Sequence, residues 1–239
     1  MSEIIIEIEN AVKKFHETTA VDNVSMSFEK GKLYGIIGRN GSGKTVLFKC
    51  ICGLSHLTSG CIIINGKKAG KGGNFSENIG MIIEHPGFLP NFSGYENLKM
   101  LACYRNQIGK KEIHKVMEQV GLDSVSKKWV GKYSLGMKQR LGIAQAIMEK
   151  PEILVLDEPM NGLDNRGVEE IRDILLGLKE EGTTILLASH NREDIEILCD
   201  EVFEMDKGKV ISHQKRKTDN QETEQKEETE QKKSEKKEA

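Results

Sequence analysis

An excess of basic residues is absent from this sequence of 239 residues. It holds 35 Lys and Arg against 37 Asp and Glu, which gives a formal net charge of −2 at pH 7. Proteins that bind nucleic acid in general usually carry a basic surplus. We therefore expect no nucleic-acid partner.

Long apolar runs are also absent. No stretch approaches the roughly 18–20 consecutive apolar residues that a membrane-crossing helix needs. The start, MSEI, lacks the basic and apolar segments of a secretory signal. Any membrane role must therefore come through a partner.

Cysteines are few and fit no metal-binding spacing. There are five, and Cys50 and Cys52 stand two positions apart, so a helix would point their thiols in different directions. We expect the cysteines to be free thiols packed as small apolar groups in a reducing compartment. A disulfide or a metal site is the alternative.

Apolar patterning divides the chain into strands and helices. Short strand patterns occupy the first third, and "NG" at 65–66 predicts a hairpin there. A helical texture follows, and strand and helix then alternate to about residue 205. This order is typical of an α/β fold with a mainly parallel sheet. We expect a helical subdomain inserted at about 88–148.

The end of the sequence has a different texture. Residues 213–239 show no apolar periodicity and repeat ETEQK at 222–226 and 228–232. Such a segment buries too little surface to offset its ordering entropy. We expect a folded domain at 1–212 and a charged, low-complexity, disordered tail at 213–239, with a docking motif as the alternative for the tail.

A glycine-rich loop carries the first chemical signal. "GRNGSGKT" at 38–45 fits the G-x-x-x-x-G-K-[ST] pattern between an expected strand and an expected helix. Backbone N–H groups at a helix N-terminus bind phosphate, Lys44 can reach the β- and γ-phosphates, and Thr45 offers a hydroxyl to Mg²⁺. A merely flexible loop is the alternative. The expected nucleotide-binding residues are Gly38, Arg39, Asn40, Gly41, Ser42, Gly43, Lys44 and Thr45.

Two adjacent acids end a later apolar strand. In "ILVLDEP" at 153–159, Asp157 falls at the carboxyl end of the strand, where ligands bind in parallel sheets. Asp157 suits Mg²⁺, directly or through water. Glu158 suits the positioning or deprotonation of the attacking water. The alternative is that two acids simply terminate a strand.

Three further stretches narrow the class of nucleotide-binding protein. They are "YSLGMKQR" at 133–140, "NGLD" at 161–164 and "LLASHN" at 186–191. In that order they resemble the signature motif, the D-loop and the switch histidine of ABC-type ATPases. The resemblance covers about residues 3–212. It implies a P-loop NTPase core with a mainly parallel sheet, an antiparallel β subdomain and an inserted helical subdomain, with ATP and Mg²⁺ as cofactors.

The resemblance also implies an ATP-dependent homodimer in which each ATP lies between the phosphate loop of one copy and the signature of the other. Ser134 and the amides near Gly136 would contact the γ-phosphate across that interface. Asp164 would bridge the interface, and His190 would contact the γ-phosphate in its own copy. Phe15 matches the family's adenine-stacking aromatic, and a core phenylalanine is the alternative for it.

The sequence departs from the family pattern in two places. The family's Leu-Ser-Gly-Gly-Gln signature is replaced by Tyr-Ser-Leu-Gly-Met at 133–137. The family's glutamine after the strand at 79–83 is replaced by Glu84. A carboxylate beside a phosphate costs about 4 kcal/mol at a separation near 4 Å unless a metal is present. We interpret Glu84 as a switch residue that contacts the metal and the water, with a solvated loop acid as the alternative.

The resemblance implies an ATPase subunit that powers a separate integral-membrane permease. It also implies a cytoplasmic location, peripheral on the inner face of the cell membrane. Glu84, "EHPGFLPNFSGYENL" and "YSLGMKQRLGIA" resemble the branch that exports bacitracin-like and lantibiotic peptides. One alternative is a non-transport ABC ATPase that acts on DNA or ribosomes. Another is a catalytically silent half-site, against which Lys44, Asp157, Glu158 and His190 all argue.

Overall fold

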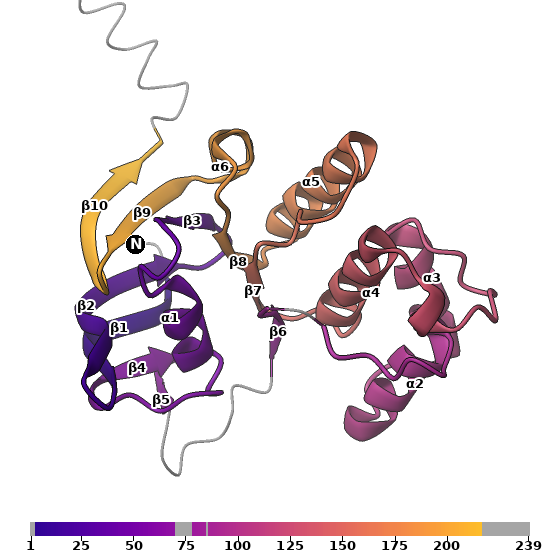
Figure 1. The fold of residues 1–239 in the computed structure, drawn as a ribbon, viewed down its shortest axis with the longest axis horizontal. Coiled ribbons are helices and arrows are strands. Elements are labelled where there is room, and N and C mark those ends of the chain that lie inside the picture. The colour runs from indigo at the N-terminus through magenta and orange to yellow at the C-terminus, as the bar shows by residue number, and fades with distance from the viewer. Residues whose placement is uncertain (1–2, 70–77, 85, 217–239) are drawn as a thin grey trace, which may run out of the picture.

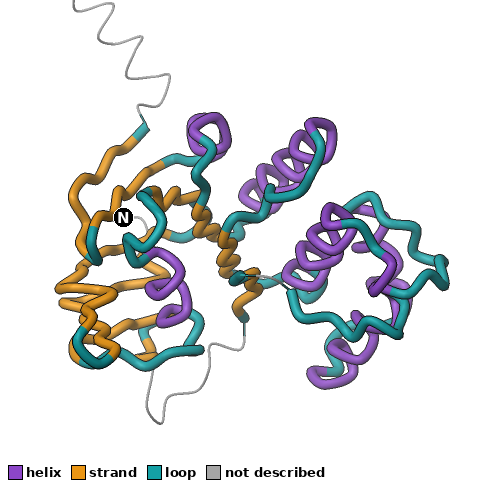
Figure 2. Tube along the Cα trace, in the orientation of Figure 1, coloured by secondary structure: helices purple, strands orange, loops and turns teal. Residues whose placement is uncertain are grey.

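The computed structural model describes residues 3–69, 78–84 and 86–216. Two sheets and a separate group of helices make up this part of the chain (Figure 1). Strands fill one side and the centre of the view, while α2, α3 and α4 lie together on the other side (Figure 2). No helix in the described ranges is long and apolar enough to cross a bilayer.

The first sheet is antiparallel and has the order β2-β1-β4-β5. Its strands are β1 (Ile4–Phe15), β2 (Thr18–Glu29), β4 (Ser59–Ile64) and β5 (Lys67–Ala69). The turn at 65–66 joins β4 to β5, where Ile64 pairs with Lys67, so the predicted hairpin is confirmed. This sheet is the expected antiparallel β subdomain.

The second sheet has six strands and is parallel except at one edge. Its order is β10 (Lys209–Lys215), β9 (Glu201–Asp206), β3 (Leu33–Ile37), β8 (Thr184–Ala188), β7 (Ile153–Asp157) and β6 (Ile79–Ile82). Ala188 pairs with Ile36 on one side and with Asp157 on the other. The carboxyl ends of β3, β7 and β8 therefore meet at one edge, and the loops that leave that edge lie close together.

Helices flank this sheet on both sides. Helix α1 (Lys44–Ile51) follows β3, α5 (Asn165–Glu180) follows β7, and α6 (Arg192–Leu198) follows β8. The inserted helical subdomain contains α2 (Gly94–Arg105), α3 (Lys110–Gln119), the 3-10 turn η1 (Val130–Lys132) and α4 (Leu135–Ile147). A capping box at Ser93 and Glu96 starts α2.

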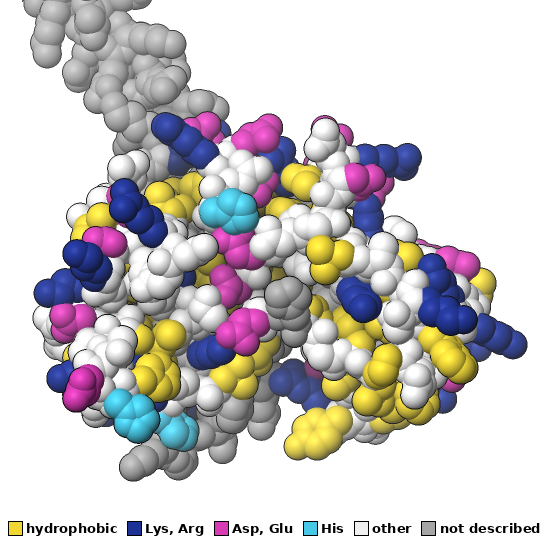
Figure 3. Space-filling view, in the orientation of Figure 1, with side chains coloured by type: hydrophobic (Ala, Val, Ile, Leu, Met, Phe, Trp, Pro, Cys, Tyr) yellow, Lys and Arg dark blue, Asp and Glu magenta, His cyan; other side chains and the backbone are white. Residues whose placement is uncertain are grey.

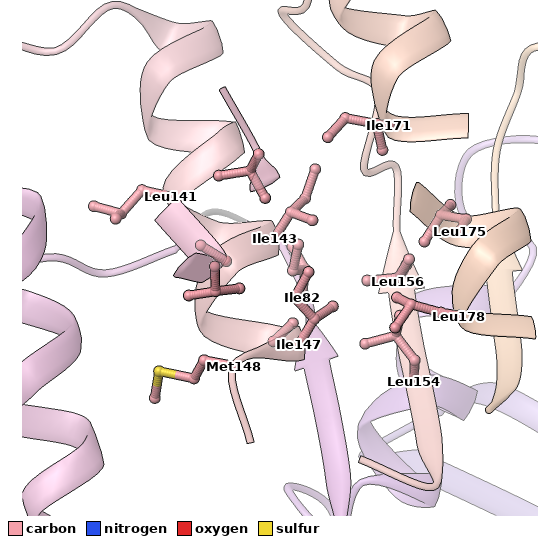
Figure 4. Packing of buried hydrophobic residues seen from close by; sticks show 14 of the residues in the cluster. Ile82, Leu141, Ile143, Ile147, Met148, Leu154, Leu156, Ile171, Leu175 and Leu178 are labelled. Atoms are coloured by element: carbon pink, nitrogen blue, oxygen red, sulfur yellow. The ribbon is translucent and has the colours of Figure 1, made fainter. Parts of the chain in front are cut away.

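Strand β7 is buried on both faces, so successive residues belong to different cores. Leu154 and Leu156 pack with Leu175 and Ile143 in the cluster that joins the sheet to α4 and α5 (Figure 4). Ile153 and Val155 pack in the cluster beneath α1 and the antiparallel sheet. The two clusters hold β7 rigidly and fix the position of the acids at its end.

The predicted fold class is confirmed, and several element bounds differ from those expected. Strand β1 is longer than the short strands expected in the first third and extends to Phe15, because β2 and β4 pair with it along its length. Strand β10 continues past position 212, where we expected the tail to begin, because it pairs with β9 as far as Lys215. Residues 217–239 of the expected tail lie outside the described residues.

The thiol prediction is only partly correct. All five cysteines are free, and Cys50, Cys52 and Cys199 are buried as expected. Cys61 is half-buried and Cys103 is exposed, so these two do not pack in a core. Cys103 lies on the exposed side of α2, next to the buried Ala102. The sequence pattern did not show which of these two neighbours faces the core.

Candidate functional site

The phosphate loop connects β3 to α1 in a conformation that requires glycine at two positions. Gly38 has φ +149° and Gly43 has φ +105°. A Cβ at Gly38 would overlap the carbonyl oxygen of Met205, and one at Gly43 would overlap that of Ala20. The loop is therefore held tightly against β9 and β2, and its backbone shape is fixed before any ligand binds.

Lys44 occupies the inside of this loop. Its Nζ donates to the carbonyl oxygens of Gly38 at 2.7 Å and Arg39 at 3.2 Å, and the residue is only 8% exposed. These bonds hold a buried ammonium at the start of α1, where the helix N-terminus also favours an anion. The arrangement places positive charge where a phosphate chain would lie.

Thr45 and Asp157 meet at the sheet edge. The Thr45 hydroxyl donates to Asp157 Oδ2 at 2.6 Å, and Asp157, the last residue of β7, is buried. A hydroxyl and a carboxylate are both oxygen ligands of the kind that Mg²⁺ prefers. Two protein ligands suit this ion, which usually completes its shell with water and substrate phosphates. The residues present therefore fit a magnesium ion.

Glu158 is held at both its backbone and its side chain. Its φ is +53°, its N–H donates to Ala188 O at 2.9 Å, and its Oε2 lies 2.8 Å from His190 Nδ1. The left-handed backbone turns the carboxylate away from the strand and out of the core. In Figure 3 acidic side chains and a histidine gather near the middle of the face, over β7 and β8.

A buried ion pair supports the segment that carries His190. Asp194, with a fully buried side chain on α6, accepts from Arg172 Nε at 2.9 Å and Nη2 at 2.6 Å. Its other oxygen accepts from Ser189 at 3.2 Å, and Ser189 in turn accepts from the N–H of Asn191 at 3.0 Å. The sequence analysis missed this network. The sequence shows Asp194 as an acid near the start of a helix. It gives no indication that Arg172 on α5 is its partner.

The signature segment starts helix α4 and lies beside the D-loop of the same chain. Ser134 caps the helix by accepting from the N–H of Met137 at 3.1 Å. A Cβ on Gly136 would lie 2.9 Å from the carbonyl oxygen of Gly162, so the two loops are in contact. Leu135 covers Gly162 and is still 56% exposed. Ser134 and Leu135 are thus presented on the surface.

Asp164 has a local structural role in this chain. It is the N-cap of α5, and its Oδ1 accepts from the N–H of Gly167 at 3.0 Å. The residue is exposed, so the remaining carboxylate oxygen is accessible. The capping bond fixes where that side chain stands at the end of the D-loop.

Phe15 lies at the end of β1 with 46% of its surface exposed. The alternative of a core phenylalanine is therefore excluded. Lys13 Nζ lies 4.6 Å from the ring centroid, which is a cation–π contact. An exposed aromatic ring of this kind offers a flat surface to a base.

Glu84 lies beside α1. Its φ is +61°, its side chain is 60% exposed, and its Oε1 accepts from Lys49 Nζ at 2.6 Å. Lys49 follows Thr45 by four residues on the same helix, so the two share a face about one turn apart. The structure thus brings Glu84 to one turn from the Thr45 hydroxyl and pairs it with a lysine.

The functional side chains gather in two places. Lys44, Thr45, Asp157, Glu158 and His190 converge at the carboxyl edge of the parallel strands. Ser134 and Gly136 stand at the start of α4, which lies across β6 and β7 from α1 in Figure 1.

A family model described as ABC transporter matches residues 21–161 of this sequence. The chain belongs to the ABC transporter family.

Curated relatives extend over most of this ABC transporter chain. The bacitracin transport ATP-binding protein BcrA of Enterococcus faecalis is 45% identical over 217 residues, covering 87% of this chain and 68% of BcrA. The lantibiotic transport ATP-binding protein SrtF of Streptococcus pyogenes is 39% identical over 207 residues, covering 87% and 89%. An uncharacterized ABC transporter ATP-binding protein of Bacillus subtilis, YybJ, is 45% identical over 211 residues, covering 88% and 97%.

Solved structures show the same fold. CbiO1 from Clostridium perfringens, part of an ABC transporter complex, has a TM-score of 0.75 and 27% identity, covering 89% of each chain. A nucleotide-free ATP-binding cassette from an ABC transporter has a TM-score of 0.78 and 27% identity, covering 90% and 92%. A cassette solved as a dimer with ADP and Pi has a TM-score of 0.82 at 22% identity, covering 90% of this chain and 100% of the cassette. At this identity the likeness shows the fold alone. The chain is an ATP-binding, ATP-hydrolysing subunit of this family.

Proposed function

We propose that this ABC ATPase binds Mg·ATP between its own phosphate loop and the signature of a second copy, and that it drives a separate membrane permease. The observation that carries the proposal is the convergence of Lys44, Thr45, Asp157, Glu158 and His190 at one sheet edge. Ser134 is exposed at the start of α4, and α4 lies across β6 and β7 from α1 in Figure 1. A phosphate loop and a signature therefore meet only between two copies.

Lys44 and the loop amides hold the triphosphate. When ATP enters, the Lys44 ammonium exchanges its bonds to Gly38 and Arg39 for phosphate oxygens. Thr45 and Asp157 hold Mg²⁺, which when bound neutralises charge on the β- and γ-phosphate oxygens. Phe15 stacks on the adenine. Each of these contacts uses a side chain whose position is set by the fold around it.

Glu158 is the general base. Its carboxylate accepts a proton from a water whose oxygen attacks the γ-phosphorus, while the bond from that phosphorus to the β,γ-bridging oxygen breaks. The products are ADP and inorganic phosphate. His190 holds the Glu158 carboxylate at 2.8 Å, and we assign it the contact with the γ-phosphate in its own copy. In this scheme Glu84 would leave Lys49 and help to hold the metal and the attacking water.

The second copy completes the site. Ser134 and the amides near Gly136 contribute donors at the N-terminus of α4, where a phosphate is favoured. Asp164 bridges the two copies. Binding of ATP at both sites favours the closed dimer, and hydrolysis releases it, as expected of a two-state element biased by its ligand.

A groove beside Glu84 suits a permease segment. A cavity of 220 Å³ between β6, α2 and α4 is lined by residues that include Met81, Leu101 and Tyr104. A second hollow of 180 Å³ shares Met81 and Gln145 with it and continues to Pro86. Tyr104 is 92% exposed and offers apolar surface at the rim. We propose that an amphipathic helix of a permease binds here and that the subunit lies on the cytoplasmic face of the membrane.

The cargo we propose is an antimicrobial peptide or peptide antibiotic, exported for resistance or self-protection. The support is the transport function in the names of two relatives, bacitracin transport for BcrA and lantibiotic transport for SrtF. Both are named for transport, which favours a transporter over the alternative of a DNA- or ribosome-directed ATPase. We propose that the folded domain ends with β10, at Lys215 rather than at the expected position 212, and that the charged tail follows it.

The decisive experiment uses Glu158→Gln. This variant should bind ATP, turn over at least about 100-fold more slowly than wild type, and elute as a dimer with ATP but as a monomer without it. Lys44→Ala is the control, because it should lose nucleotide binding and stay monomeric. Unchanged turnover would remove Glu158 as the base, and a nucleotide-bound monomer would remove the shared site.

The same variant tests the partner. Tagged Glu158→Gln, trapped with ATP in its native cell and purified from detergent-solubilised membranes, should bring an integral-membrane protein with it. Recovery with ribosomes or DNA-repair proteins, and with no integral-membrane protein, would support the alternative function.

A further inference from the structure

Gln139 links the signature helix to the catalytic loop of its own chain. It lies on α4, five residues after the cap Ser134, and is only 7% exposed. Its Nε2 donates to the carbonyl oxygen of Pro159 at 2.9 Å and to that of Glu158 at 3.4 Å. A side-chain amide on α4 therefore holds the backbone directly after β7.

The bond falls on a backbone turn that contacts from β8 and from the turn itself also hold. Glu158 has φ +53°, a conformation unfavourable for a residue with a Cβ unless its surroundings fix it. Its N–H is held by β8 through Ala188 O at 2.9 Å, and its carbonyl also accepts from Asn161 N–H at 3.2 Å. Gln139 is the contact that reaches this turn from the helical subdomain.

We propose that Gln139 is a positioning residue that couples the two ATP sites of the dimer. The inference relies on the proposed function, in which Ser134 contacts the ATP of the partner copy while Glu158 acts on the ATP of its own copy. An α-helix is rigid over the roughly 7.5 Å that five residues span. A shift of Ser134 on engaging one ATP is carried by α4 to Gln139 and from there to the backbone of Glu158.

The simpler interpretation is that Gln139 only satisfies two buried carbonyl oxygens. Buried carbonyls need partners, so removal of the amide would lower stability in either case. The two interpretations differ in what happens to turnover. A coupling residue alters the rate and the cooperativity in ATP, whereas a stabilising residue alters the unfolding midpoint alone.

Thr183 provides a matched control. It is 9% exposed, and its hydroxyl donates to the carbonyl oxygen of Pro151 at 3.4 Å. Like Gln139, it satisfies a buried proline carbonyl with a side-chain donor. It precedes β8, so it lies at the amino edge of the sheet, opposite the site. Thr183→Val removes this donor with little change in shape.

The test compares Gln139→Leu, Gln139→Glu and Thr183→Val in the full-length protein, with steady-state ATP hydrolysis, nucleotide affinity and urea unfolding measured for each. Both Gln139 variants should keep ATP affinity within about twofold and lose about 10- to 100-fold in kcat, since a misplacement near 1 Å has an effect of that order. Their Hill coefficient for ATP should fall toward 1. Thr183→Val should shift the unfolding midpoint while leaving kcat and the Hill coefficient unchanged.

If both Gln139 variants left kcat and the Hill coefficient unchanged, as expected for Thr183→Val, the coupling role would be overturned. Gln139→Glu keeps the side-chain size but is a poor donor, so it serves if Gln139→Leu does not fold. Failure of the proposed function would give a different result. In that case Glu158→Gln would hydrolyse ATP as fast as the wild type, or neither would hydrolyse it. If Glu158→Gln stops ATP hydrolysis while both Gln139 variants keep the kcat and Hill coefficient of the wild type, only the coupling inference is refuted.

Discussion

The carboxylate of Glu84 is bound by Lys49, with Oε1 and Nζ 2.6 Å apart. Lys49 stands one helical turn beyond Thr45, whose hydroxyl donates to Asp157. The family has a neutral glutamine at the position of Glu84, so the added negative charge in this chain is matched by a lysine on α1. Glu84 therefore has two competing partners, Lys49 and the expected metal.

Replacing Lys49 should favour the metal-facing position of Glu84. An exposed ion pair contributes up to about 1 kcal/mol, or about fivefold in an equilibrium. Lys49→Met should therefore lower the Mg²⁺ concentration for half-maximal ATP hydrolysis by about two- to fivefold. The control is Lys49→Met in a Glu84→Gln background, where the Mg²⁺ requirement should not change. An equal shift in both backgrounds would show that Lys49 acts independently of Glu84.

Loss of Asp194 should strongly destabilise the fold. Its removal leaves the Arg172 guanidinium without its buried carboxylate, which typically costs about 3–5 kcal/mol. Asp194→Ala should show this loss in urea unfolding. The exposed pair of Arg192 and Glu196 on the same helix gives the control, because Glu196→Ala should change stability by less than about 0.5 kcal/mol. Similar losses in the two variants would contradict the importance of burial.

Phe15 should affect nucleotide affinity and leave stability nearly unchanged. A base stacked on an aromatic ring contributes about 1–3 kcal/mol, so Phe15→Ala should weaken ATP binding by about 5- to 150-fold. Phe15→Trp keeps a flat ring and should retain affinity. Fluorescence titration with a nucleotide analogue measures both. If Phe15→Ala bound ATP as tightly as wild type, the adenine would have to lie elsewhere.

The buried and exposed thiols should differ in their rate of reaction with a thiol reagent at pH 8. Burial raises the pKa of Cys52 and of Cys199 to about 12. Because the thiolate is the reactive form, about one such thiol in 10,000 is ionised at pH 8. A thiol reagent at pH 8 should label exposed Cys103 first and label Cys52 and Cys199 only in urea. Cys103→Ser should abolish the fast phase, and fast labelling that persists in this variant would contradict the assignment.

Local motifs made the phosphate loop and the strand-end acids predictable. The glycines before Lys44 and the acid at the end of an apolar strand are each determined by a few neighbouring residues. The parallel pairing of Ala188 with both Ile36 and Asp157 then brings these segments together. The burial of β7 on both faces likewise follows from a short apolar run.

Contacts between distant segments were not predictable from one sequence. Gln139 and Pro159 are 20 residues apart, and Arg172 and Asp194 are 22 apart. Nothing in the sequence around either partner indicates the other, because the distance between them is set by how α4, α5 and α6 pack. The ion pair of Glu84 depends in the same way on where β6 ends relative to α1. The extra length of β1 and β10 also depends on pairing partners.

The positive φ angles of Glu84 and Glu158, +61° and +53°, have a consequence for engineering. A left-handed backbone costs an ordinary residue about 1–2 kcal/mol, and glycine escapes this cost. Directed evolution that rewards heat resistance alone should therefore enrich glycine at both positions, and each such gain would remove a carboxylate to which we assign a role in the reaction. Thermostable lineages of this ATPase need a concurrent selection for turnover, since at these two positions robustness and activity pull in opposite directions.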